Sequence, residues 1–365
     1  MSDNKLIRKE ILSIKPYIPG KPIEEVKREL GLKEVIKLAS NENPLGPSPL
    51  AVERMGETIK GVNIYPDGNV HRLREKLSVK LGVEGNQLIF GNGSDEILVM
   101  LAQAFIDKGD EVIMAETTFS EYEFATNIMG GEIVKVPLKD YTHDLKAMAE
   151  TISDNTKMIF ICNPNNPTGT AVGRAEVEDF LDKVNEDIIV VFDEAYYEYV
   201  SDKNYPQSLD YLLDYENLII LRTFSKIYGL GGLRVGYGIA NEKIISYLER
   251  VRQPFNVNAI AQEGALASLE DQSHIRESLD YNRQGKEYLY REFDKLGLDY
   301  VPTETNFILV DLPKSNDQVF KELLKQGIII RSLSSYGYKT KIRVTIGLPE
   351  DNKKFIKALK SLLNK

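Results

Sequence analysis

The sequence predicts an α/β protein with a large domain built on a mostly parallel, seven-stranded sheet and a smaller α+β domain. Two observations support this prediction. Between residues 88 and 240, short β-branched apolar runs alternate with longer helical patterns, which is typical of crossover units around a parallel sheet. After about residue 255 the pattern changes to long helical segments followed by further apolar runs. A chain of 365 residues is long enough for two unequal domains.

Apolar runs predict the strands of the large domain. Helical periodicity separates them; for example, Ile97, Leu101 and Phe105 fall on one face of a helix. The predicted strands are residues 88–90, 111–115, 132–136, 158–162, 188–192, 218–221 and 235–239.

The C-terminal part predicts the smaller domain, and the N-terminal part predicts an arm. Residues 1–45 are rich in Pro and Gly, which favours turns and extended chain, and we expect them to pack partly with the small domain. The large domain is then 46–255 and the small domain 256–365. Its predicted elements are helices 259–270, 275–296 and 350–363 and strands 307–312, 327–331 and 342–346.

Composition excludes several classes of function. With 46 basic and 55 acidic residues, the net charge of -9 gives no basic footprint for nucleic acid or an anionic membrane. The single cysteine and the three histidines follow no metal-ligand spacing, so we expect no metal, and we expect the histidines at the surface or on helix faces. A charged N-terminus without a following apolar segment predicts no secretion signal and hence a cytoplasmic protein.

Polar residues follow three of the predicted strands directly. They are Asn166 in NPNNPTG, Asp193 in DEAYYE and Lys226 in TFSK. The carboxyl ends of parallel strands meet at one edge of a sheet, so these side chains are expected to face one crevice. Each residue alone has an ordinary structural explanation, whereas the three together predict a binding site.

This set of side chains fits pyridoxal phosphate. A lysine amine forms a Schiff base with an aldehyde, and a carboxylate beside a pyridine nitrogen keeps that nitrogen protonated. Lys226 supplies the amine and Asp193 the carboxylate, while Asn166 and Tyr196 are expected to hydrogen-bond the ring hydroxyl. Phe119, in TTFSEY, is expected to stack on the ring.

The cofactor phosphate needs donors, and GNGSDEIL offers backbone amides at a helix start, where the helix dipole favours anions. We expect the side chain of Asp95 to point away from the phosphate. The predicted phosphate-binding residues are Gly93, Ser94, Asp95, Thr223, Ser225 and Arg234.

At this point the motifs carry a family resemblance. NPNNPTG, DEAY and SKIYGLGGLRVG resemble the fold type I pyridoxal-phosphate aminotransferases. Further segments, which span nearly the whole chain, resemble the histidinol-phosphate aminotransferase family: KPYIPGKP, KLASNENPLGPSP, YPDG, GNGSDEIL, GIIIRS and IRVTIG. Phe119 departs from the family pattern, in which the stacking residue is often Tyr.

The resemblance implies a homodimer with shared active sites, in which Tyr65 reaches the cofactor phosphate of the neighbouring subunit. It also implies that Arg343 binds the carboxylate of the amino-acid partner, that Tyr17 and Arg331 hold the substrate phosphate, and that Asn41 lies on the substrate side.

The implied reaction is a ping-pong transamination between L-histidinol phosphate and 2-oxoglutarate, giving imidazole-acetol phosphate and glutamate. Lys226, Asp193 and Tyr196 are the expected catalytic residues, and the Lys226 amine is expected to move the α-proton.

Other functions stay open at this point. An aromatic amino-acid aminotransferase or a threonine-phosphate decarboxylase of the same fold uses the same Lys226, Asp193 and Arg234. A nicotinamide dehydrogenase is disfavoured, because Glu96 stands where the third glycine of G-x-G-x-x-G is needed.

Overall fold

The larger sheet of the computed structural model confirms the predicted strands. The structure describes residues 6–14, 16 and 21–363. Within them, all seven predicted runs lie in one seven-stranded sheet of order β2-β8-β7-β6-β5-β3-β4, in which β8 runs opposite to the other six strands. The strands are β2 (Leu88–Gly91), β3 (Glu111–Ala115), β4 (Glu132–Val136), β5 (Thr156–Cys162), β6 (Ile189–Asp193), β7 (Leu218–Thr223) and β8 (Gly236–Ala240).

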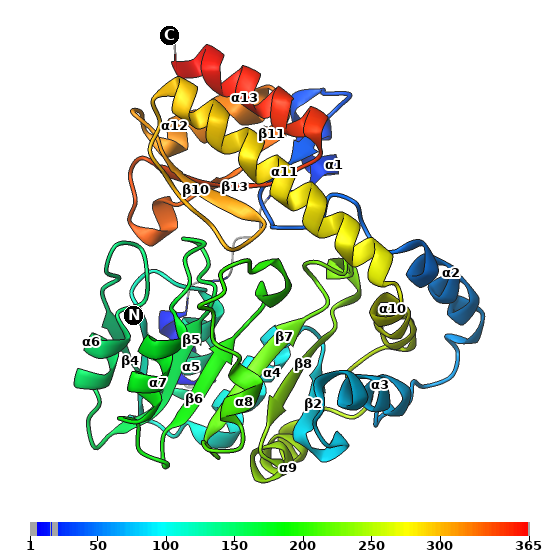
Figure 1. Cartoon of the computed structure of the whole chain (residues 1–365), viewed down its shortest axis with the longest axis vertical. Helices are drawn as coiled ribbons and strands as arrows, with labels where there is room; N and C mark the ends of the chain where they lie inside the picture. Colours follow the sequence, from blue (N-terminus) through cyan, green and yellow to red (C-terminus); the bar gives the residue numbers. More distant parts are fainter. Residues whose placement is uncertain (1–5, 15, 17–20, 364–365) are drawn as a thin grey trace.

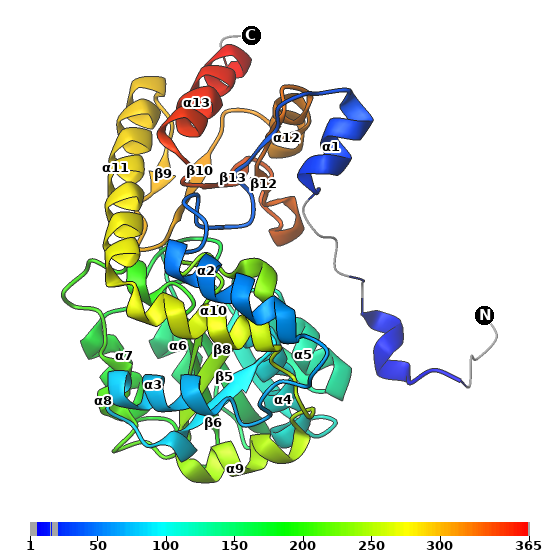
Figure 2. The ribbon, with the colours of Figure 1, turned by 90° about the vertical axis from the view of Figure 1, so that its right-hand side faces the viewer.

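Helices cover both faces of this sheet, which gives the three layers of an α/β fold (Figures 1 and 2). One face packs its apolar side chains against α4 (Ser94–Phe105), α5 (Glu121–Met129) and α9 (Glu242–Val251). The opposite face packs against α3 (His71–Leu81), α6 (Leu145–Glu150), α7 (Arg174–Leu181), α8 (Ser208–Tyr211) and α10 (Ala259–Glu270). Burial on both faces explains why the central strands are continuous apolar runs.

A separate, smaller layer of sheet and helices lies at the carboxyl edge of the larger sheet (Figure 1). Its four-stranded antiparallel sheet has the order β12-β13-β10-β9. The strands are β9 (Tyr300–Val301), β10 (Phe307–Asp311), β12 (Arg331–Ser332) and β13 (Lys341–Thr345), and the helices are α11 (Gln272–Leu296), α12 (Asn316–Lys325) and α13 (Pro349–Leu363).

The predicted strand 327–331 is divided in the structure. Its first part, β11 (Ile328–Ile329), pairs in parallel with β1 (Ile36–Lys37), whereas β12 pairs with β13. The chain therefore passes from a two-stranded sheet to the four-stranded sheet within this run. Apolar composition alone gives no sign of such a change of partner.

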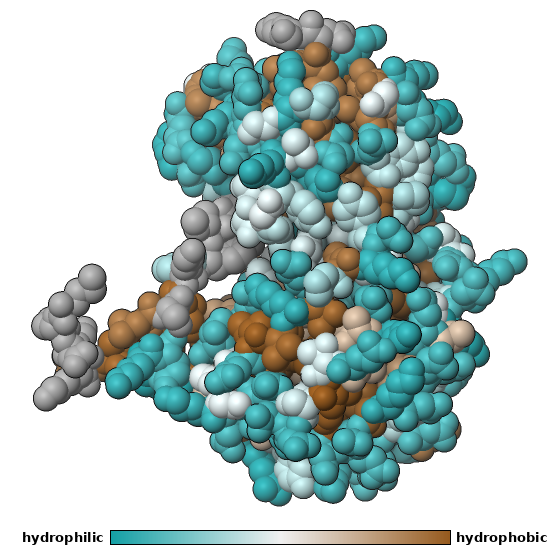
Figure 3. All heavy atoms as spheres, turned by 90° about the vertical axis from the view of Figure 1, so that its left-hand side faces the viewer, coloured by the Kyte–Doolittle hydropathy of each residue, from teal (hydrophilic) through white to brown (hydrophobic). Residues whose placement is uncertain are grey.

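Part of the predicted arm packs against this smaller layer. Helix α1 (Ile23–Leu30) buries Val26, which packs with Ala39 and with Ile329 of β11. Residues 6–14 instead contact α5, where the Arg8 guanidinium donates to the Ile128 carbonyl at 2.7 Å. Figure 3 shows apolar side chains gathered on this extending segment, although most of the visible face is hydrophilic.

Helix α10 joins the core beside the larger sheet. Asn258 caps it by accepting from the Ala261 N–H at 2.8 Å, and it lies against α2 (Pro49–Thr58) (Figure 2). Helix α11 then runs upward to the small sheet (Figure 1). The boundary between residues 255 and 256 stays a prediction; from this packing we propose a boundary after α10, at Asp271.

No helix in the described part of the chain is both long and apolar enough to cross a membrane.

Candidate active site

Two adjoining cavities lie where the larger sheet meets the smaller layer. They share Phe119, Asn166, Tyr196 and Lys226, so together they form one site. The first is also lined by Ser94, Asp95, Cys162, Asp193, Ala195, Thr223, Ser225 and Arg234. The second is also lined by Ala39, Ser40, Asn41, Ser120, Arg331, Tyr336 and Arg343. The structure thus brings most of the predicted site residues together, including the three that follow β5, β6 and β7.

Lys226 lies where the two cavities join. Its Nζ is 3.5 Å from the Ser40 carbonyl oxygen and 5.5 Å from the centre of the Tyr196 ring. Burial, together with the nearby positive charge of Arg343, lowers the pKa of the Lys226 amine to about 8. A substantial fraction of this amine is therefore neutral near physiological pH, as a nucleophile or base must be.

Asp193 ends β6 and is only 3% exposed. One carboxylate oxygen, Oδ2, accepts from the Tyr122 hydroxyl at 2.7 Å, and Oδ1 accepts from the Ala195 N–H at 3.2 Å. Burial raises the pKa of this carboxyl to about 6, against the lowering effect of the Tyr122 hydrogen bond. A buried carboxylate of this kind favours a cationic partner.

At the other end of the first cavity, Arg234 reaches toward the start of α4. Its guanidinium lies 3.4 Å from the Ser225 hydroxyl, and a Cβ added to Gly93 would come within 2.3 Å of its Nη2. Gly93 also has φ +81, so this position requires glycine for both space and backbone conformation. The helix start, Arg234 and Ser225 together form a cradle for an anion.

The expected orientation of Asp95 is wrong. Its Oδ2 forms an ion pair with Arg234 Nη2 at 2.8 Å, and the side chain lines the first cavity instead of pointing away from it. The physical reason is that a guanidinium at the cavity attracts the nearest carboxylate, which here is in the first turn of α4.

Tyr196 and Asn166 are held by residues of the second cavity. The Asn41 side-chain amide donates to the Tyr196 hydroxyl at 2.8 Å, and the Arg343 guanidinium donates to the Asn166 side-chain oxygen. Asn41 thus contacts a cofactor-side residue, and its φ of 56 shows a backbone fixed in the left-handed region.

Arg331 and Arg343 project from neighbouring strands into the second cavity. They are directly paired residues of β12 and β13, and both line the cavity. Arg343 is 8% exposed and also donates to the Ala39 carbonyl at 2.6 Å. Two guanidinium groups on one face of a sheet repel each other and favour binding of an anion.

Tyr65 lines neither of these cavities in the described part of the chain. Its side chain is 80% exposed, and its ring stacks on Phe255 with 4.9 Å between centroids. Tyr17 lies outside the described residues.

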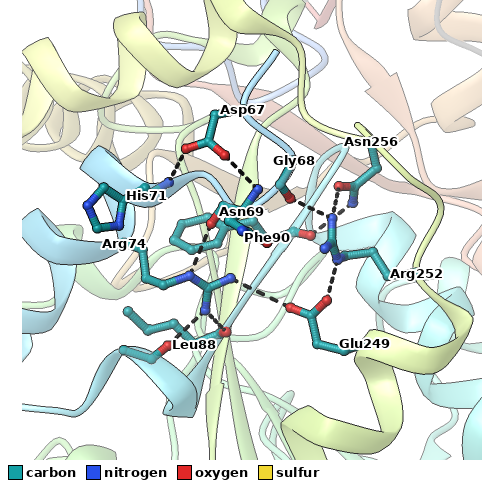
Figure 4. Close-up of polar contacts among 11 residues, drawn as sticks. Asp67, Gly68, Asn69, His71, Arg74, Leu88, Phe90, Glu249, Arg252 and Asn256 are labelled. Carbon is teal, nitrogen blue, oxygen red and sulfur yellow. Dashed lines mark hydrogen bonds and ion pairs between the residues drawn. The ribbon is translucent and has the colours of Figure 1, made fainter. Parts of the chain in front are cut away.

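Polar contacts hold the loop of Tyr65, residues 62–70, against the larger sheet (Figure 4). The Arg252 guanidinium donates to the Gly68 carbonyl at 3.0 Å and to the Asn256 side-chain oxygen at 3.1 Å, and the Asn256 amide donates to the Phe90 carbonyl at 2.9 Å. Phe90 belongs to the strand that leads into α4. The loop of Tyr65 is therefore fastened to the segment that forms the anion cradle.

Sequence reasoning missed Tyr122 and the residues behind the NPNNPTG loop. Tyr122 follows Phe119 by three residues in TTFSEY, and the two rings meet edge to face although Phe119 precedes α5. Asn165 accepts from the Thr118 hydroxyl at 2.8 Å and lies 3.2 Å from His143 Nε2. His143 is 4% exposed in a loop, so its expected place at the surface or on a helix face is wrong.

In residues 6–14, 16 and 21–363, no group of three or more His, Cys, Asp and Glu side chains could hold a metal ion.

Comparisons with known proteins agree on one family. Residues 33–359 match the family model described as aminotransferase class I and II. A histidinol-phosphate aminotransferase of Moorella thermoacetica is 56% identical over 357 residues, which cover 98% of this chain and 92% of that protein.

Solved structures also resemble this chain. A histidinol-phosphate aminotransferase from Sinorhizobium meliloti, in complex with pyridoxal-5'-phosphate, is 25% identical with a TM-score of 0.91, covering 100% of this chain and 99% of the other. An L-threonine-O-3-phosphate decarboxylase from Porphyromonas gingivalis is 26% identical with a TM-score of 0.81, covering 91% and 100%. Structural similarity alone thus does not separate the two activities.

Proposed function

We propose that this chain, which belongs to the histidinol-phosphate aminotransferases within aminotransferase class I and II, transfers the amino group of L-histidinol phosphate to 2-oxoglutarate. The products are imidazole-acetol phosphate and glutamate, and the reaction belongs to histidine biosynthesis. The observation that carries this proposal is the 56% identity to a histidinol-phosphate aminotransferase over 98% of the chain. The decarboxylase alternative has 26% identity to support it, and no observation favours an aromatic amino-acid aminotransferase.

The first cavity fits pyridoxal phosphate as the cofactor. Its cradle at Gly93 and Ser94 has no room for a Cβ beside Arg234, which suits the close approach of a phosphate to the backbone. Thr223 and Ser225 add hydroxyl donors, and Asp95 contributes its backbone N–H. The buried carboxylate and the lysine at the opposite end match a pyridine ring nitrogen and an aldehyde.

When bound, the cofactor supplies an aldehyde and an electron-withdrawing ring, and the protein supplies the charges and the proton acceptor. Lys226 receives and returns the substrate α-proton through its Nζ, which the lowered pKa of its amine supports. Asp193 holds the ring-nitrogen proton by its negative charge.

Three further residues orient the cofactor ring in this proposal. Asn166 and Tyr196 donate to its hydroxyl, each held in turn by Arg343 and Asn41, respectively. Phe119 lines both cavities and offers an aromatic face for stacking.

The second cavity binds the anionic groups of the substrates in this proposal. Arg343 binds the α-carboxylate of glutamate or 2-oxoglutarate with parallel hydrogen bonds, and Arg331, with Tyr17, binds the phosphate of histidinol phosphate. Asn41 completes the substrate side beside Tyr196. The juxtaposition of two guanidinium groups supports a pocket that serves two different anions in turn.

We further propose that the protein acts in the cytoplasm as a homodimer in which Tyr65 of each subunit reaches the cofactor phosphate of the other. The 80% exposure of Tyr65 on its anchored loop supports this role. Both substrates carry several charges, which makes unassisted transfer across a lipid bilayer costly, so a reaction on them fits the cytoplasm.

Incubation of the protein with histidinol phosphate, 2-oxoglutarate and pyridoxal phosphate tests the function directly. Glutamate is expected to accumulate in step with loss of histidinol phosphate. Phenylalanine, tyrosine and threonine phosphate serve as competing substrates. Faster transamination of an aromatic amino acid, or carbon dioxide release from threonine phosphate, would overturn the assignment.

A further inference from the structure

Tyr122 makes the shortest side-chain contact to Asp193 that the structure gives. The Tyr122 hydroxyl, on α5, donates to Asp193 Oδ2 at 2.7 Å, while the backbone N–H of Ala195 donates to Oδ1 at 3.2 Å. Tyr122 is 0% exposed, so no water competes for this hydrogen bond. Donors of the protein therefore orient both oxygens of the Asp193 carboxylate.

The Tyr122 ring is fixed by aromatic neighbours on two sides. It stacks on Phe160 of β5, with 4.5 Å between centroids and 2° between planes. Its ring also meets Phe119 edge to face, with 5.6 Å between centroids and 84° between planes. Phe119 lines both cavities, so Tyr122 touches the residue proposed to stack on the cofactor as well as the residue proposed to face its ring nitrogen.

The charges around Asp193 give this hydrogen bond an electrostatic effect. Burial and the charge of Asp95 raise the pKa of Asp193, whereas the Tyr122 hydrogen bond and the charge of Lys226 lower it. Burial keeps the pKa of Tyr122 well above its usual value, and burial raises the pKa of the neighbouring Cys162 thiol to about 12. Tyr122 thus stays a neutral donor, and Cys162 adds no charge.

We propose that Tyr122 is a positioning residue for the cofactor, which keeps Asp193 ionised and oriented through its hydroxyl and supports Phe119 through its ring. This inference rests on the proposed function, because it assumes that Asp193 faces a protonated pyridine nitrogen. Tyr122 touches neither substrate nor reacting atoms in this assignment.

The dissociation constant of pyridoxal phosphate, measured by visible absorbance between pH 5 and 8, tests the proposal without an activity assay. Affinity is expected to fall as the pH falls through the pKa of Asp193, since a neutral carboxyl does not hold the ring proton. Tyr122→Phe removes only the hydroxyl and keeps the ring contacts. It is expected to move the midpoint upward by on the order of one pH unit, a roughly tenfold change in ionisation.

Two controls isolate the contact. Tyr211→Phe removes a tyrosine hydroxyl that lies 3.3 Å from the Glu178 carboxylate, away from both cavities, and should leave the midpoint unchanged. In an Asp193→Asn background, Tyr122→Phe should cause no shift, because titrations of the cofactor phosphate and of Lys226 are common to both members of the cycle.

An unchanged midpoint in Tyr122→Phe, or an equal shift in the Asp193→Asn background, would overturn the inference while leaving the proposed function intact. If Tyr122→Phe does not fold, Tyr122→Met, which also lacks a donor and fills an irregular space in a core, takes its place: an upward shift that is absent in the Asp193→Asn background supports the role of the donor, and an unchanged midpoint contradicts it. A wild-type protein that binds no pyridoxal phosphate would instead overturn the proposed function itself.

Discussion

Arg331 and Arg343 lie directly opposite each other in the antiparallel pair of β12 and β13, with both side chains at the same cavity. Like charges at such cross-strand positions destabilise a sheet by up to about 1 kcal/mol. Their neighbours Ser332 and Ile342 form the next pair and face the other way, since side chains alternate along a strand. A pair of guanidinium groups in this place is best explained by anionic ligands.

Single substitutions of these arginines should separate the two half-reactions. We expect Arg343→Gln to impair chiefly the reaction with glutamate and Arg331→Gln chiefly the reaction with histidinol phosphate, each by roughly 1.5 to 3 kcal/mol per lost charge-assisted contact. Single-turnover mixing followed by cofactor absorbance measures each half-reaction alone. Equal losses in both half-reactions for both variants would contradict the division of roles.

Lys226→Ala should abolish turnover, because the amine is needed both to hold the cofactor aldehyde and to move the α-proton. The purified wild-type protein should be yellow, and this variant should lose the absorbance band that depends on the lysine. Lys243→Ala, an exposed lysine on α9, is the matched control and should behave like wild type. Near wild-type turnover in Lys226→Ala would sink the assignment of the active-site lysine.

The lowered pKa of Lys226 also predicts a pH-dependent cost in stability of the cofactor-free protein. The folded amine titrates at about 8 and the unfolded one at 10.5, so the unfolded state binds more protons between these values and stability rises with pH across them. Burial of the charged amine costs at most about 3 kcal/mol below pH 8 and nothing above pH 10.5.

Lys226→Met should therefore stabilise the cofactor-free protein near pH 7, with a gain that disappears as the pH rises toward 10.5. Urea unfolding of both proteins across this range gives the difference in unfolding free energy, from which the titration of all other groups cancels. A constant difference between pH 7 and 10.5 would show that Lys226 titrates normally.

Asp193→Asn should leave the fold intact and slow the reaction. A neutral amide does not hold the pyridine proton, so we expect a loss on the order of several kcal/mol of transition-state stabilisation, as for other preorganised charges. Circular dichroism checks the fold, and kcat measures the loss. Unchanged kinetics would remove Asp193 as the partner of the ring nitrogen.

Much of the larger sheet was predictable because a strand buried on both faces needs a continuous apolar run, and turn formers mark its ends. Asn166, Asp193 and Lys226 were predictable as neighbours for the same reason, since each follows such a run. The divided strand around Ile330 was not predictable, because an unbroken apolar run gives no sign that the residues before and after Ile330 pair with different strands.

Residues that act on other side chains were also missed. In the sequence, Tyr122 has the pattern of an ordinary residue on the apolar face of a helix. Only the fold shows that its hydroxyl contacts Asp193, 71 residues away in the chain. The side chain of Asp95 turned toward Arg234 because a pairing between distant residues overrode the local expectation. The roles of Tyr65, Arg331 and Arg343 depend on family resemblance, since exposed or alternating residues carry little signal of their own.

Two defective variants, combined in one dimer, test whether Tyr65 acts across the subunit interface. If Tyr65 serves the neighbouring site, Tyr65→Ala and Lys226→Ala should each be impaired as homodimers. A mixed dimer then contains one site with both residues intact and one site with neither. Unfolding and refolding an equal mixture should restore about a quarter of wild-type activity, because about half of randomly formed dimers are mixed and each has one intact site. Sedimentation verifies that the refolded species is dimeric. No gain over the separate variants would mean that Tyr65 does not act across the interface, and a fully active monomer would exclude the shared site altogether.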